Sequence, residues 1–201
     1  MQTVSIFFER EVADKERWRK LSLSVAYVKF SHTFLLVLVA LTVLMGSGVS
    51  FAESRVFGGN LSLQKYGSGE LRRFGFLVYE AQLWAGSNPA EPPIALQLTY
   101  KRDIAGFKIA NASVDHMREL GASEQQLAVW GPAMAKIFPD VKPGDQIIGI
   151  YRPGTAIFLY NNREIGQIND ADFARLFFGI WLDPRTTEPK LRNKLLQVGA
   201  G

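Results

Sequence analysis

The sequence predicts an α+β domain built on a mainly antiparallel sheet. Three observations support this class. Two apolar, strand-like segments come early in the domain, two segments with helical periodicity follow them, and three short strand-like segments joined by turns come next. Two further helices complete the order. No internal repeat or low-complexity segment interrupts it, so a single domain accounts for the pattern.

The first part of the domain is predicted to be β structure. Leu61–Leu63 alternates apolar and polar residues and Gly67–Gly69 breaks the pattern, which indicates a short strand followed by a turn. A long strand is predicted over 74–84, because apolar residues occupy both of its faces. After a loop that contains several prolines, residues 94–100 are predicted to form another strand.

Two helices are predicted next. The first has five apolar residues on one stripe, followed by Gly121 in the position of a C-terminal cap; the stripe consists of Phe107, Ala110, Val114, Met117 and Leu120. Ser123 and Gln126 have the spacing of a capping box, so a second helix is expected to begin there. Its apolar side is expected to face inward, and Pro139 lies just beyond its end.

The last part of the domain returns to strands and then to helices. Strands are predicted over 146–151, 155–160 and 163–168, because residues that favour turns separate them. Asp170 can cap a helix that runs through Phe178. Thr187 can cap a final helix that has Pro189 in its first turn.

Residues 1–52 have the features of an N-terminal export leader. Residues 34–45 contain no charged or strongly polar group, and basic residues precede them. Ser50 and Ala52 occupy the two small-residue positions that a signal peptidase reads, which predicts cleavage after Ala52 and a folded domain over 53–201. Counted as 34–52, the segment has nineteen residues, so an uncleaved anchor in the inner membrane is the alternative.

Composition excludes several classes of site. The 201-residue chain has no cysteine, which excludes disulfides, thiolate nucleophiles and cysteine-ligated metals. Its two histidines, His32 and His116, are too few for a histidine-rich metal site, and we expect neither a metal nor a cofactor. The net charge of +4 is mild and no basic run occurs, so no nucleic-acid partner is predicted.

Several segments, taken in order, resemble the bacterial chalcone isomerase-like family. The segments are 67–84, 95–100, Met117–Gly121, Phe138–Val141 with Gly144–Asp145, and Phe177–Leu182 with Leu191–Arg192 and Leu195–Leu196. The likeness covers nearly all of residues 55–197. It implies the open-faced β-sandwich of chalcone isomerases, which is a long antiparallel sheet with helices packed on it and a ligand cleft between them. It also implies export into a bacterial periplasm, which the leader indicates independently.

The resemblance implies less about chemistry than about fold. Chalcone isomerases stabilise an enolate with a cationic arginine, and threonine and tyrosine hydroxyls hold water near the ketone. Tyr79 stands where the enzymes have their catalytic threonine, which resembles the non-catalytic, fatty-acid-binding branch of the fold. In that branch an arginine and a tyrosine hold a carboxylate. The matching arginine is either Arg72 or Arg73, and no catalytic residue is assigned.

Strand geometry distinguishes the two arginines. In one regular strand Arg73 shares the face of Tyr79, whereas Arg72 lies on the opposite face. Six residues of strand span about 20 Å, so Arg73 and Tyr79 could not hold the same carboxylate directly. A bend or bulge at Gly75 would be needed to bring them together.

The candidate ligand-binding residues are Tyr79, Arg73, Arg72, Trp84 and Tyr100. Each also has a purely structural interpretation. The tyrosines and Trp84 could be core aromatics, and the arginines could lie at a solvated strand end. His116 is predicted to be a surface residue, because it lies off the apolar stripe of its helix.

Three functions from different classes are compatible with these features. The first is an exported, non-catalytic protein that binds a small apolar or amphipathic, fatty-acid-like ligand in the cleft between sheet and helices. The second is an isomerase, that is, an intramolecular lyase of the chalcone isomerase type. The third is an interaction protein of the cell envelope without a small ligand. The aromatic-rich strands and the tyrosine in place of threonine favour the first.

Overall fold

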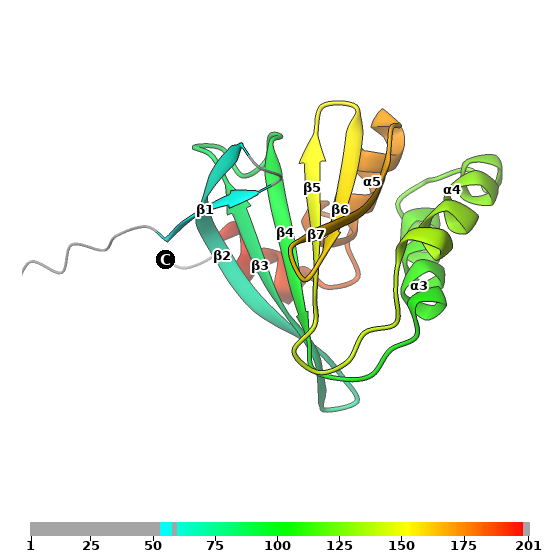
Figure 1. Cartoon of the computed structure of the whole chain (residues 1–201), viewed down its shortest axis with the longest axis horizontal. Helices are drawn as coiled ribbons and strands as arrows, with labels where there is room; N and C mark the ends of the chain where they lie inside the picture. Colours follow the sequence, from blue (N-terminus) through cyan, green and yellow to red (C-terminus); the bar gives the residue numbers. More distant parts are fainter. Residues whose placement is uncertain (1–52, 58–59, 199–201) are drawn as a thin grey trace, which may run out of the picture. The chain divides into compact units, whose positions relative to one another are not determined.

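The computed structural model describes residues 53–57 and 60–198. In this part of the chain seven strands form one sheet, in which each strand is antiparallel to the next in sequence (Figure 1). The strands are β1 (Ser54–Phe57), β2 (Leu61–Arg73), β3 (Phe76–Ala85), β4 (Ile94–Tyr100), β5 (Gln146–Arg152), β6 (Thr155–Tyr160) and β7 (Arg163–Ile168). The predicted leader, residues 1–52, lies outside the described residues.

Four helices accompany the sheet in the described ranges: α3 (Gly106–Glu119), α4 (Glu124–Ile137), α5 (Ala171–Leu182) and α6 (Pro189–Leu196). Helix α6 packs on β2 and β3, α5 packs on β5 and β6, and α3 packs on α4 and α5. Figure 1 shows α5 and α6 behind the sheet and the α3–α4 pair beside its β7 end. The predicted α+β class with a mainly antiparallel sheet is therefore confirmed. None of these helices is long and apolar enough to cross a membrane.

The first long strands of the sheet, β2 and β3, differ from the prediction. Residues 67–69 do not form a turn, because β2 runs without interruption from Leu61 to Arg73. Gly67 is needed for close packing instead: a Cβ there would lie 2.2 Å from the backbone oxygen of Leu195 in α6. The turn lies at Phe74 and Gly75, where φ is 51° and 82°. The strand predicted over 74–84 therefore begins at Phe76 and forms a hairpin with β2.

Most helix boundaries follow their capping residues. The Ser123 side chain accepts from the Gln126 backbone N–H and the Gln126 side chain accepts from the Ser123 N–H, which confirms the capping box. Asp170 caps α5 by accepting from two backbone N–H groups, although the helix continues beyond Phe178 to Leu182. The predicted cap at Thr187 is wrong, because Glu188 is the residue that precedes α6.

The core has two parts, one on each face of the sheet. The larger part lies between the sheet and the helices and includes an aromatic cluster around α5, made of Phe138, Phe158, Phe173, Phe177, Phe178 and Trp181. Phe107 was predicted to join this core but is 56% exposed, because α3 turns Ala110, Ser113 and Met117 inward instead. The smaller part, on the opposite face, contains Phe57 and Trp84.

Candidate functional site

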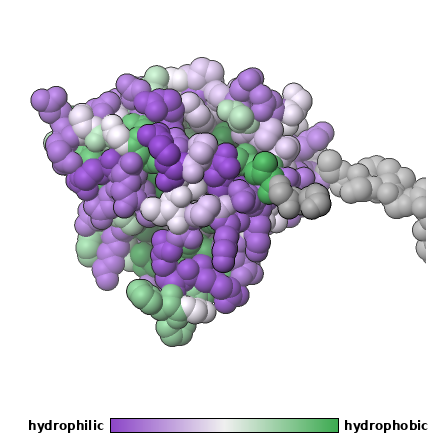
Figure 2. All heavy atoms as spheres, turned by 180° about the vertical axis from the view of Figure 1, so that it is seen from behind, coloured by the Kyte–Doolittle hydropathy of each residue, from purple (hydrophilic) through white to green (hydrophobic). Residues whose placement is uncertain are grey.

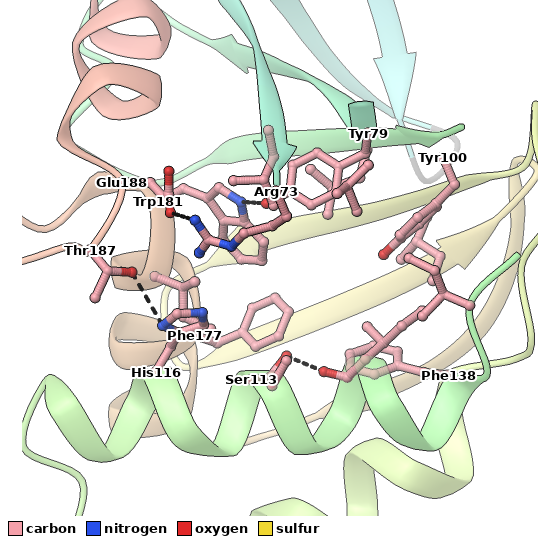
Figure 3. Close-up of a pocket in the computed structure, with 18 residues that line it drawn as sticks. Arg73, Tyr79, Tyr100, Ser113, His116, Phe138, Phe177, Trp181, Thr187 and Glu188 are labelled. Atoms are coloured by element: carbon pink, nitrogen blue, oxygen red, sulfur yellow. Dashed lines mark hydrogen bonds and ion pairs between the residues drawn. The ribbon is translucent and has the colours of Figure 1, made fainter. Parts of the chain in front are cut away.

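A cavity of about 170 Å³ lies between α3, α5 and the ends of β2, β3 and β4. Most of its lining is apolar, with side chains that include Leu71, Val78, Leu98, Ile109, Phe138 and Phe177. A few polar side chains join them, and Figure 3 shows these converging from the sheet and from the facing helices. An apolar hollow with a few convergent polar groups is the usual form of a small-molecule site.

Tyr79 reaches the cavity from β3. Its hydroxyl oxygen accepts a hydrogen bond of 2.9 Å from Trp181 Nε1, which comes from α5 (Figure 3). Because the hydroxyl is the acceptor in this bond, its own proton is free to be donated to a ligand. Burial raises the pKa of Tyr79 well above its ordinary value of 10.0, and the hydrogen bond from Trp181 opposes this effect only in part. The hydroxyl is therefore a neutral donor at physiological pH.

Tyr100 stands beside Tyr79 on the neighbouring strand. The two residues are paired in the β3–β4 register, and their rings meet edge to face with centroids 5.9 Å apart. Tyr100 is 3% exposed and lines the cavity; its hydroxyl has no hydrogen-bond partner among residues 53–57 and 60–198, and it opens onto the cavity. Burial raises the pKa of this hydroxyl as well. Tyr100 thus offers the cavity a second neutral hydroxyl, which points inward in Figure 3.

Arg73 brings a positive charge to the mouth of the cavity. It is the last residue of β2, and its guanidinium forms an ion pair with Glu188, just before α6 (Figure 3). The turn at Phe74 and Gly75 explains how it reaches the site. Arg73 and Tyr79 lie on two strands of a hairpin, with Leu71 paired to Tyr79, and not on the single strand that the sequence predicted. The long separation calculated for one strand therefore does not apply.

Two of the predicted ligand-binding residues do not line the cavity. Arg72 is paired with Glu70 at 2.9 Å and has a side chain 54% exposed. Trp84 is buried in the core cluster on the opposite face of the sheet. The structure thus brings Arg73, Tyr79 and Tyr100 together and places Arg72 and Trp84 elsewhere.

Sequence reasoning missed the contribution of α3. His116 was predicted on the surface, but its side chain is only 30% exposed and lines the cavity. Its Nδ1 lies 3.4 Å from Thr187 Oγ1 and 3.3 Å from Glu119 Oε2. Ile109, Ser113 and His116 follow the i, i+4, i+7 spacing of one helix face, which was the signal that could have grouped them.

The remaining polar groups of the cavity are few. Ser113 on α3 is buried at the cavity wall and bonds back to Ile109 O at 2.9 Å, so its hydroxyl is already engaged. Among the residues that the structure describes, no group of three or more histidine, aspartate and glutamate side chains is placed to hold a metal ion. What the cavity offers a ligand is apolar contact, two neutral phenol donors and one paired cation.

Comparisons with known proteins agree with the fold. A family model described as chalcone isomerase-like matches residues 45–197. An uncharacterized protein of Haemophilus influenzae is 29% identical over 136 residues, which are 66% of this chain and 67% of that protein. The fold is similar to the crystal structure of a fatty-acid binding protein of Arabidopsis thaliana, with a TM-score of 0.51 and 14% identity over 72% of this chain and 96% of that one.

Proposed function

Since the chain belongs to the chalcone isomerase-like family, we propose that it is a non-catalytic protein that binds a small amphipathic, fatty-acid-like molecule in the cavity beside Tyr79. The observation that carries the proposal is the Tyr100 hydroxyl, which opens onto an apolar cavity and has no hydrogen-bond partner in the part of the chain that the structure describes. A ligand oxygen in the cavity would accept a hydrogen bond from this hydroxyl. The likeness to a fatty-acid binding protein supports the same ligand class.

The polar groups suggest how such a ligand would lie. Its hydrocarbon part would occupy the space among Leu98, Ile109 and Phe138, where it is removed from water. Its polar end would accept hydrogen bonds from the tyrosine hydroxyls, or would meet Arg73 at the mouth after competing with Glu188. Both arrangements use neutral or cationic donors, which suit a carbonyl or carboxylate oxygen.

The size of the cavity limits the ligand. A closed apolar cavity of about 150 Å³ accommodates a group as large as one benzene ring. The 170 Å³ found here therefore suits a single ring or an alkyl chain of up to medium length. Drug-sized ligands occupy larger pockets, of about 300 Å³ or more. A medium-chain fatty acid such as octanoate is accordingly the first ligand to test.

Two observations favour binding over isomerisation. Stabilising an enolate needs a cation that is free to meet the developing charge, whereas Arg73 is already paired with Glu188. A chalcone also carries two aromatic rings, which is more than a cavity of 170 Å³ suits. The existence of the cavity itself favours a ligand-binding protein over an interaction protein with a filled interior.

Isothermal titration calorimetry with octanoate tests the proposal. The full-length protein should show saturable binding. Ser113→Leu should abolish it, because the larger side chain fills the cavity from α3. Ala128→Leu is the matched control, since Ala128 is exposed on α4 and away from the cavity. Octanoate binding that is absent from the wild type, or unchanged in Ser113→Leu, would contradict the proposal.

We also propose that the protein is exported to the periplasm by its leader. The support is the pattern of basic residues, apolar core and small residues before position 52. Mass spectrometry of the protein from the periplasmic fraction should give a mature N-terminus at Glu53. A chain that keeps residues 1–52 in the membrane fraction would favour the anchor over 34–52 instead. The same preparation can be extracted with organic solvent to identify a co-purified ligand.

A further inference from the structure

The tip of the β2–β3 hairpin exposes two aromatic side chains. Phe74 is 97% exposed and Phe76 is 56% exposed. Figure 2 shows a hydrophobic group projecting from the lower end of an otherwise largely hydrophilic face, where Figure 1 places this hairpin. Phe74, at 97% exposure, gains almost nothing from packing within the domain, so its presence there needs another explanation.

Turn chemistry does not explain Phe74 either. Phe74 and Gly75 both have positive φ, 51° and 82°, which is the geometry of a two-residue hairpin turn. Such turns favour Asn-Gly or Asp-Gly, and a bulky residue with positive φ is a genuine outlier. The first turn position therefore holds phenylalanine against the local backbone preference. This points to a use for the ring outside the folded domain.

Four cationic residues come from the segments that form or adjoin the end of the hairpin. The four are Arg72, Arg73, Lys101 and Arg102. Three of them have carboxylate partners, in the pairs Arg72–Glu70, Arg73–Glu188 and Lys101–Glu80. Arg102 has no such partner within the described ranges; its guanidinium lies 4.3 Å from the centre of the Phe76 ring. Glu70 and Glu80 are paired to each other in the register, farther from the turn than Arg72 and Arg73.

We propose that the hairpin tip docks on an anionic lipid surface, with Phe74 and Phe76 inserted at the interface and the neighbouring arginines on the headgroups. Aromatic rings prefer the interface of a bilayer, and nearby basic residues are attracted to anionic lipids. A protein partner is less favoured, because a stable protein interface buries about 1,000 Å² or more and two side chains at a narrow tip supply far less. A lipid surface needs no such complementary shape.

Docking by this tip has a consequence for the cavity. Leu71, Arg73, Val78 and Tyr79 all belong to the hairpin, and all line the cavity. The mouth beside Arg73 would then lie close to the lipid, so that an amphipathic molecule could pass between membrane and cavity. The inference goes beyond the proposed function, and docking itself does not require a ligand in the cavity.

A tryptophan reporter at the tip tests the proposal directly. Phe74→Trp in the full-length protein is mixed with vesicles of phosphatidylcholine and phosphatidylglycerol that carry brominated acyl chains, which quench nearby indoles. Its emission should shift to the blue and be quenched. Val129→Trp is the matched control, because Val129 is 68% exposed on α4, away from the hairpin. The four native tryptophans, which include Trp18 in the leader, are common to all variants, so the signal of position 74 is the difference in quenching between Phe74→Trp and the wild type.

The quenching results with and without phosphatidylglycerol, and at the two reporter positions, either support or overturn docking by the hairpin. When phosphatidylglycerol is omitted, the lipid concentration for half-maximal quenching at position 74 should rise about tenfold, since the arginines lose their anionic partners. No quenching at position 74 would overturn the proposal and favour a protein partner. Equal quenching at positions 74 and 129 would also overturn it. Because the test contains no octanoate, its failure is distinct from a failure of the cavity to bind ligand.

A second variant separates docking from folding. Phe74→Asn places a residue that tolerates positive φ at the turn, so its midpoint of urea unfolding should be at least equal to that of the wild type. In the same variant, a Phe76→Trp reporter should show weaker quenching by the brominated vesicles than it does with Phe74 present. A lower unfolding midpoint would show that Phe74 serves the fold. Unchanged quenching would show that Phe74 does not contribute to lipid contact. Either result would overturn the proposal.

Discussion

Arg73, the last residue of β2, is paired at the mouth of the cavity with Glu188, the residue that precedes α6. The pair joins two ends of the domain that lie far apart in sequence. The pair also engages the Arg73 guanidinium, which is the charged group best suited to bind a ligand carboxylate. The Arg73 side chain is 47% exposed and that of Glu188 is 25% exposed, so water screens the pair in part and a ligand can compete for it.

Glu188→Gln should therefore strengthen the binding of carboxylate ligands. Without the Glu188 charge, Arg73 can meet the headgroup of octanoate, and the affinity should rise roughly three- to fivefold, in keeping with a partly exposed ion pair. The affinity for octanol, which has no charge, should stay the same. Both are measured by calorimetry. The control is Glu70→Gln, which frees Arg72 instead, and Arg72 does not line the cavity. An equal gain in this control would show that only net charge matters.

The two cavity tyrosines should respond differently to removal of their hydroxyls. Tyr79→Phe leaves the buried Nε1 of Trp181 without an acceptor, so it should destabilise the protein by about 1–3 kcal/mol. Tyr100→Phe removes a hydroxyl with no partner in the described residues and should change stability by less than about 0.5 kcal/mol. Urea unfolding measures both changes.

Octanoate binding separates the roles of the same two residues. Tyr100→Phe should weaken binding even though the fold is unaffected, because the ligand loses a hydrogen-bond donor. If Tyr100→Phe instead costs as much stability as Tyr79→Phe, the Tyr100 hydroxyl has a partner within the protein. The proposal that a ligand satisfies this hydroxyl would then fail.

The turn between α5 and α6 should give the protein a defined acid response. Hydrogen bonds from Arg185 lower the pKa of Asp183 to about 2, from 3.8 in the unfolded chain. A lowered carboxyl pKa adds stability above pH 3.8, and that contribution is lost as the pH falls towards 2. Arg185→Gln should thus lower the stability of the protein at pH 7 only modestly, since Arg185 is exposed and water screens its interaction with Asp183.

The measurement is urea unfolding of wild type and Arg185→Gln at pH 7, 5, 4 and 3. The difference between the two should be constant down to about pH 4 and should shrink below it. A difference that stays the same at pH 3 would mean that Arg185 acts by packing alone. Because this turn carries Glu188, Arg185→Gln should also change octanoate affinity at pH 7 if the turn positions the Arg73 pair.

Helix caps and tight turns could be predicted from the sequence, because their signals lie within a few neighbouring residues. The capping box at Ser123 and the cap at Asp170 were predicted from residues within one helical turn, and the turn residues separated β5, β6 and β7. Tyr79 and Tyr100 were chosen as candidates, and they do line one cavity. Their roles as ligand-binding residues remain predictions that the experiments above address.

What the sequence did not reveal depends on contacts between distant segments. His116 lies off the most apolar stripe of α3, yet it lines the cavity because Thr187 and α5 come to that side of the helix. Arg73 was expected on the same strand as Tyr79, since Phe74 gives no turn signal of its own. Periodicity describes a segment by itself, and neither feature follows from one segment.

The largest local error, the turn expected at Gly67, leads to the last prediction. Gly67 lies inside β2, where a Cβ would come within 2.2 Å of the Leu195 oxygen and 2.5 Å of the Lys194 oxygen. Both are backbone atoms of α6 and cannot rotate away. Gly67→Ala should therefore push α6 off the sheet and destabilise the protein by about 1–3 kcal/mol.

Gly86→Ala is the matched control for Gly67→Ala, because a Cβ at Gly86 meets nothing within 4 Å; it should change stability by less than about 0.5 kcal/mol, or increase it slightly. Urea unfolding compares the two variants. Displacement of α6 would also move Glu188, which immediately precedes it, so Gly67→Ala should alter octanoate affinity while Gly86→Ala should not. Equal stability of the two variants would mean that α6 does not depend on the close approach of its backbone to β2.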